Sequence, residues 1–102
     1  MNDPHFHTDF CIGADHPALP GHFPGQPVVP GVVLLDRVAA AIADWKSARI
    51  IGMPQVKFLQ ALLPDEEAEL RLEDGGGGVR FHISRAGAVI ATGLVEIAGD
   101  DA

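Results

Sequence analysis

Residues 21–47 read GHFPGQPVVPGVVLLDRVAAAIADWKS, and their character changes at Gly31. Before Gly31, prolines recur at every third position (24, 27 and 30). After it the stretch contains no proline, and apolar residues lie on almost every side of a helix with 3.6 residues per turn. The stretch therefore predicts a stiff, irregular segment that leads directly into one helix. We expect this helix to run from Gly31 to about Ser47 and to be buried on most sides.

The proline period has two interpretations. It can form a polyproline II ligand that a partner recognises, or a rigid scaffold packed inside the domain. Phe23, Val28 and Val29 interrupt the prolines, and the segment adjoins a buried helix. Both features favour the scaffold, and stiff loops beside rigid elements are common places for functional sites.

The start of the helix is a candidate binding point. Pro30 suits the first helical position, where its missing N–H loses no hydrogen bond. The free N–H groups of Gly31 and Val32 could then polarise a carbonyl oxygen, as an oxyanion hole does. A glycine is equally expected here if the chain only needs a tight turn, and the residues alone leave both possibilities open.

The rest of the chain alternates apolar and polar residues, as strands do. We expect strands at residues 5–14, within 49–63, and at 67–73, 79–84 and 88–97, with turns at 74–78 and 85–87. One helix and an antiparallel meander give an α+β architecture, in which a curved sheet or a second copy of the domain would cover the helix. The 102 residues suit a single domain, and residues 98–102 are expected to form a mobile tail.

Composition excludes several functions. The chain carries 14 acidic against 7 basic residues, a net charge of −7, and the basic residues are scattered. Binding to nucleic acid or to an anionic membrane surface is therefore not expected. Cys11 is the lone cysteine, the first residues lack the pattern of a signal peptide, and no apolar run is long enough to span a bilayer. These features predict a soluble protein of the cytoplasm.

Asp36 interrupts an apolar stripe of the expected helix. Its neighbours three and four positions away are all apolar: Val32, Val33, Ala39 and Ala40. An aspartate buried there would have to be paired or protonated, and a protonated one could donate a proton. Alternatively, Asp36 bonds a backbone N–H or lies at a solvated rim. His22 is the natural basic counterpart, and a symmetric dimer could bring His22 of one subunit to Asp36 of the other.

The remaining histidines do not have the spacing of a metal site. With one cysteine and no His-x-x-x-His pair on a helix, a zinc site is not expected. The chain also lacks a dinucleotide-binding glycine motif, a P-loop and a Gly-x-Ser-x-Gly motif.

Residues 22–31, HFPGQPVVPG, followed by Asp36, resemble the active-site segment of the FabA/FabZ group of hotdog-fold 3-hydroxyacyl-[acyl-carrier-protein] dehydratases. That group shows His-Phe, a short turn, Pro-Val-Met-Pro-Gly, and then a Glu or Asp on the central helix. The segments 56–58, 63–65 and 89–96 are similar to further parts of its pattern. In its shortness the chain is similar to the compact members that serve aryl-polyene and other specialised acyl pathways.

The resemblance implies a hotdog homodimer with composite active sites and a role for each matching residue. His22 would remove the α-proton of a 3-hydroxyacyl thioester, and Asp36 of the other subunit would protonate the departing hydroxyl. The Gly31 N–H would hold the thioester carbonyl, and the Val28 carbonyl would orient the His22 ring. The acyl group would be carried by acyl carrier protein or coenzyme A, and the reaction would need neither cofactor nor metal.

Two positions depart from the group. Asp36 stands where most FabZ-type members carry Glu, and Ala40 stands where many carry Gln. Carrier proteins are acidic, so docking would use a local basic patch drawn from Arg37, Lys46, Arg49 or Lys57. Two alternatives remain open: a hotdog thioesterase, which would release free acid, and a non-catalytic acyl- or carrier-binding subunit paired with an active relative.

Overall fold

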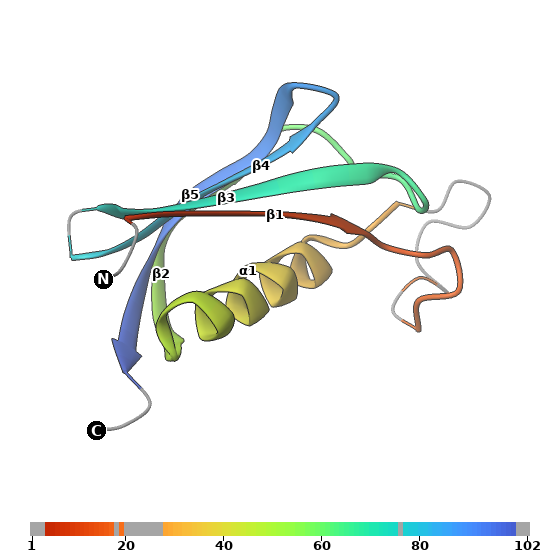
Figure 1. The fold of residues 1–102 in the computed structure, drawn as a ribbon. Helices are drawn as coiled ribbons and strands as arrows, with labels where there is room; N and C mark the ends of the chain where they lie inside the picture. Colours follow the sequence, from red (N-terminus) through yellow and green to blue (C-terminus); the bar gives the residue numbers. More distant parts are fainter. Residues whose placement is uncertain (1–3, 18, 20–27, 76, 100–102) are drawn as a thin grey trace.

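The computed structural model describes residues 4–17, 19, 28–75 and 77–99. Its elements are, in chain order, β1 (His5–Cys11), α1 (Gly31–Lys46), β2 (Ala48–Phe58), β3 (Glu67–Gly75), β4 (Gly78–Arg85) and β5 (Ala88–Gly99). The strands form one antiparallel sheet in the order β1-β3-β4-β5-β2. The helix α1 lies along one side of this curved sheet (Figure 1). The predicted α+β architecture is therefore confirmed.

The core lies between α1 and the sheet because each element has one apolar face. Every second residue is buried from Ala68 to Leu72 in β3 and from Val79 to Ile83 in β4, and Phe81 at the centre of β4 is completely enclosed. The helix contributes five buried residues: Val33, Leu34, Val38, Ala41 and Ile42. The alternation predicted for 67–73 and 79–84 is confirmed, because side chains on a strand point to opposite faces in turn.

The prediction that the helix is buried on most sides is wrong for the single chain. Val32 keeps 62% of its surface exposed, and Asp36, Ala40 and Ala43 are also exposed. The sheet can cover only one side of a helix, and the alanines that made the helix apolar all round bring little area to bury. Among the described residues, one face of α1 thus has no covering layer.

Several element ends differ from the sequence prediction. β1 ends at Cys11, three residues early, and β5 continues to Gly99, so the first two residues of the predicted tail belong to a strand. There, Ala98 and Gly99 pair with Arg49 and Ala48 of β2. Most of the proline-rich segment, and positions 100–102, lie outside the described residues.

The last strand of the sheet, β2, is an edge strand. Among the strands of the described residues it pairs with β5 alone, and its register shifts between Ile50 and Gly52 and again between Gly52 and Gln55. Such irregularities bend a strand. In the part of the chain that the structure describes, no helix is long and apolar enough to cross a membrane.

Candidate active site

No side chain of the described residues caps the N-terminus of α1. Pro30 is the N-cap residue, with extended backbone, and it has no hydrogen-bonding side chain to offer. Its carbonyl accepts a hydrogen bond from the N–H of Val33 at 2.9 Å. No acidic residue stands in the first turn. The first N–H groups of a helix have no partner within it, and the helix dipole makes this end electropositive. An acceptor oxygen can therefore be bound here.

The entry to α1 is fixed by a neighbouring loop. The Val29 N–H donates to the Leu62 carbonyl at 2.8 Å, which ties the residue before the N-cap to loop 59–66 between β2 and β3. The same loop is anchored to the end of β1, where the Asp65 N–H donates to the Ile12 carbonyl at 2.8 Å. Asp65 has a positive φ of 68°, which aspartate tolerates better than most residues.

Arg85, at the end of β4, holds this loop from the other side. Its guanidinium donates to the Gln60 side-chain oxygen at 2.9 Å and to the Ala61 carbonyl, and it lies 3.3 Å from Glu66 Oε1. The same Glu66 oxygen accepts the N–H of Leu63 at 2.8 Å. Sequence reasoning assigned Arg85 only to a turn. Its role could not be found from spacing, because its partners lie 19 to 25 residues away.

The backbone at Gly31 lies directly against the ring of Phe58. A Cβ atom at this position would lie only 2.7 Å from Cζ of the Phe58 ring. Gly31 is not among the residues with positive φ, so no turn conformation demands glycine here. The tight-turn explanation is therefore wrong. The absence of a side chain lets the Phe58 ring sit against the first turn of the helix.

Gly31 and Phe58 border an open pocket of about 410 Å³. Its other lining residues are apolar apart from Gln60: Val29, Leu34, Leu59, Ala61 and Leu62. Loop 59–66 thus forms one wall and the start of α1 the other. An apolar cleft with polar backbone groups at one end suits an acyl chain with a carbonyl at its head.

The structure places three of the four predicted site residues. Val28 and Gly31 belong to the entry of α1, and Asp36 lies on its exposed face. His22 lies outside the described residues. Asp36 does not line the pocket beside Gly31. In the single chain Asp36 is not buried among apolar neighbours, because Val32 and Ala40 on either side of it are exposed as well; its position agrees with the alternative of a solvated rim.

Exposed apolar residues gather on the segment from β2 into the loop. Ile51, Met53, Phe58 and Leu59 each keep between 46% and 59% of their surface exposed. An unpaired strand edge that carries large apolar side chains is a typical place for another chain to bind.

The four candidate docking cations have different surroundings. Lys46 is bound to Asp74 at 2.8 Å and lies over the Trp45 ring. Arg49 donates to the Gly99 carbonyl, and Arg37 lies over the Phe10 ring. Lys57 is exposed and adjoins Phe58 in the chain. Of the four, Lys57 is the one whose chain neighbour lines the pocket.

Comparison with known proteins places the chain in a family. Residues 2–94 match the ApeI-like family, described as ApeI dehydratase. The chain belongs to this family.

The chain is also similar to individual dehydratases. It is 28% identical over 99 residues to the 3-hydroxyacyl-[acyl-carrier-protein] dehydratase FabZ of Haemophilus influenzae, an alignment that covers 87% of this chain and 62% of that protein. FabZ of Chlamydia trachomatis is 33% identical over 98 residues, covering 80% and 64%. The chain thus spans less than two thirds of the length of these relatives.

A solved structure supports the fold. The dehydratase heterocomplex ApeI:P of Xenorhabdus doucetiae superposes with a TM-score of 0.82 at 19% sequence identity, covering 92% of this chain and 87% of that one. One helix packed on a five-stranded antiparallel sheet is the hotdog arrangement that the resemblance implied, and this prediction is confirmed.

Proposed function

We propose that this protein dehydrates 3-hydroxyacyl thioesters, carried by acyl carrier protein, to trans-2-enoyl thioesters. The observation that carries the proposal is the uncapped start of α1, which opens on an apolar pocket at Gly31 and leads to Asp36 on the same helix. Membership of the ApeI-like dehydratase family and the names of the FabZ relatives support the same reaction.

In the proposed mechanism the acyl chain lies in the pocket and its thioester carbonyl accepts the Gly31 N–H. The His22 imidazole removes the α-proton, and negative charge moves onto the carbonyl oxygen, where the helix N-terminus stabilises it. Asp36 gives a proton to the 3-hydroxyl group, which leaves as water while the double bond forms. The Val28 carbonyl orients the His22 ring. The reaction needs no metal and no cofactor.

We infer that a second hotdog subunit completes the site, as a homodimer. Asp36 is exposed and does not line the pocket beside Gly31, so an acid from one subunit would serve the pocket of another. The edge of β2 and the exposed face of α1 offer the apolar surface for such pairing: Val32, Ile51, Met53 and Phe58. The same surface is equally open to a different hotdog subunit, and ApeI:P is itself a heterocomplex.

The proposed partner is acyl carrier protein, and the proposed compartment is the cytoplasm. Lys57 adjoins Phe58, which lines the pocket, and Arg37 adjoins Asp36, so both cations are available beside the proposed site to an acidic carrier. The lone Cys11 permits no disulfide within this sequence, in keeping with a reducing compartment.

The reaction is tested in reverse, as hydration of a short 2-enoyl thioester. The rate is measured from the loss of the substrate's ultraviolet absorbance. We expect turnover by the wild-type protein and a loss of at least about 100-fold for His22→Ala and for Asp36→Asn. Matched controls are His82→Ala and Asp44→Asn, the latter an exposed aspartate farther along α1. Release of free thiol would indicate a thioesterase instead. No turnover with either carrier-protein or coenzyme A substrates would indicate a non-catalytic subunit.

A further inference from the structure

A separate cluster of polar side chains lies on the face of the sheet that is turned away from α1. Phe6 and Phe10 of β1 pack on the core, so the alternation of the strand turns His7 and Asp9 to the opposite face. In the register of β1 with β3, Asp9 is paired with Glu69. Three potential metal ligands are thus brought together from two strands.

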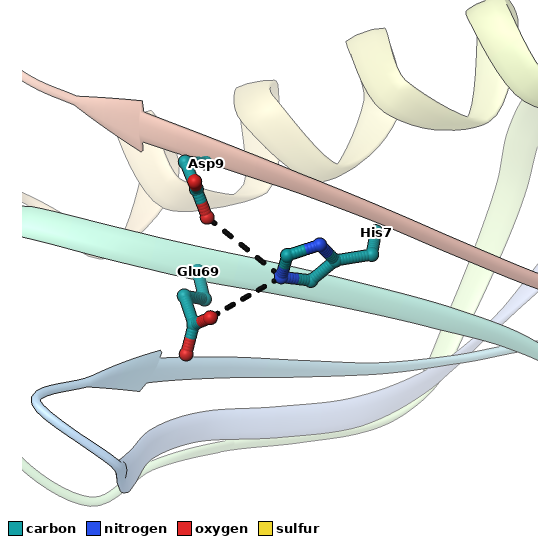
Figure 2. Close-up of side chains that lie close together, drawn as sticks. All are labelled: His7, Asp9 and Glu69. Carbon is teal, nitrogen blue, oxygen red and sulfur yellow. Dashed lines mark hydrogen bonds and ion pairs between the residues drawn. The ribbon is translucent and has the colours of Figure 1, made fainter.

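The three side chains converge on one point. His7 Nε2 lies 3.2 Å from Glu69 Oε2 and 3.7 Å from Asp9 Oδ1. All three ligand atoms lie within 4.8 Å of one another. Figure 2 shows the imidazole nitrogen between the two carboxylates, which approach it from β1 and from β3. The side chains keep 52% to 60% of their surface exposed, so an ion from solvent can reach them without any opening of the fold.

Electrostatics favour a cation at this point. Like charges directly opposite each other on neighbouring strands destabilise a sheet, and Asp9 and Glu69 form such a pair. Arg71 is the register partner of His7, but no ion pair between Arg71 and either carboxylate is found among the described residues. Arg71 lines the same surface pocket as His7 and Glu69, so it offsets the negative charge beside the His7 nitrogen only from a distance.

We propose that His7, Asp9 and Glu69 bind a divalent transition-metal ion of the Zn²⁺ type. Imidazole nitrogen with carboxylate oxygens is a donor set that zinc uses, at bond lengths of about 2.0–2.2 Å. In a tetrahedral site such bonds place neighbouring ligand atoms about 3.3 Å apart. The distances from His7 to Glu69 and to Asp9 are close to that value. Water completes the fourth position.

The ion would act as a cross-link. It joins β1, the strand at one end of the described sheet, to its neighbour β3. Binding to the folded state raises its stability, because the unfolded chain does not hold the three ligands together. The site lies on the opposite face of the sheet from α1 and is independent of the proposed dehydration. A metal here is not expected to take part in catalysis.

The test is calorimetric titration of metal-free protein with Zn²⁺ alone, in the full chain carrying Cys11→Ser so that the thiol does not contribute. We expect one Zn²⁺ ion to bind tightly per chain. Loss of a residue that only hydrogen-bonds to a metal ligand typically costs about 10- to 100-fold in metal affinity. Because His7 is proposed as a ligand itself, His7→Gln is expected to weaken Zn²⁺ binding by at least about tenfold. Asp9→Asn and Glu69→Gln should also weaken it. The matched control is His5→Gln, on the same strand and the same face, which should leave binding within about twofold.

Thermal unfolding provides the second readout. Saturating Zn²⁺ should raise Tm of the Cys11→Ser protein, and the His7→Gln variant should lose this rise while keeping its metal-free Tm, since His7 is exposed. Unchanged Zn²⁺ affinity in His7→Gln, or an equal loss in His5→Gln, would overturn the proposal. The absence of heat on titration of the protein with all three ligands intact would also overturn it.

Discussion

The ring of Phe58 occupies the space that a side chain on residue 31 would need. A Cβ atom on Gly31 would lie 2.7 Å from Phe58 Cζ, 3.0 Å from Cε2 and 3.1 Å from Cε1. Phe58 ends β2 and Gly31 begins α1, so this contact joins the edge strand to the helix start where the pocket opens.

Gly31→Ala should therefore destabilise the protein. In an ordinary helical position the exchange stabilises by roughly 0.5–1 kcal/mol. Here the added methyl group must displace the half-exposed Phe58 ring, and we expect a net loss of up to about 1 kcal/mol in the free energy of unfolding, measured by urea denaturation. Phe58→Ala, combined with Gly31→Ala, should recover most of the loss. A stabilised Gly31→Ala protein would mean that the half-exposed ring simply rotates away.

Arg85 should act as a positioning residue for the pocket wall. Arg85→Met keeps the length of the side chain but removes its hydrogen bonds to Gln60 and Ala61. We expect a loss of about 1–2 kcal/mol in stability and faster amide exchange in loop 59–66 than in the rest of the protein. Arg80→Met, on the same strand but exposed, should change neither. Uniformly faster exchange across the whole sheet would show that Arg85 has no special relation to the loop.

The β4–β5 turn contains avoidable strain. Ala86 and Gly87 both have positive φ, 51° and 83°, as a type I′ turn requires. Alanine pays a steric cost in this conformation, so Ala86→Gly should raise the free energy of unfolding by roughly 1 kcal/mol. Ala88→Gly, two residues on in extended backbone, should lower it instead. Equal effects of the two exchanges, seen in thermal melts, would contradict this reading of the turn.

Charges on the edge of β2 should break the proposed assembly. Ile51 and Met53 are exposed in the single chain, at 59% and 46%, so the double exchange Ile51→Lys, Met53→Lys should leave the fold intact. Light scattering coupled to size exclusion should then report a monomer, and hydration activity should fall with it. Val89→Lys, an exposed apolar residue beside the β4–β5 turn, is the control. A monomeric wild-type protein with full activity would rule out a composite site.

Local patterns were sufficient to predict most elements. The alternation in 67–73 and 79–84 and the proline-to-helix change at Gly31 depend only on neighbours in sequence, and the structure agrees at each place. The end of β5 could not be predicted in this way. Ala98 and Gly99 have low strand propensity and are extended because β2 pairs with them.

By itself, then, the sequence determined the α+β order of elements, the helix start at Gly31 and, through residues 22–31 and Asp36, the family to which the chain belongs. Only the tertiary structure decided what surrounds each candidate residue. Asp36 is exposed because the sheet covers only one side of α1 and Asp36 lies on another side. The tertiary structure also set Phe58 on Gly31 and brought Glu69 to His7 and Asp9. These contacts join residues 27 to 62 positions apart. The periodic pattern of a strand shows which of its residues share a face, but not which residues of another strand they meet.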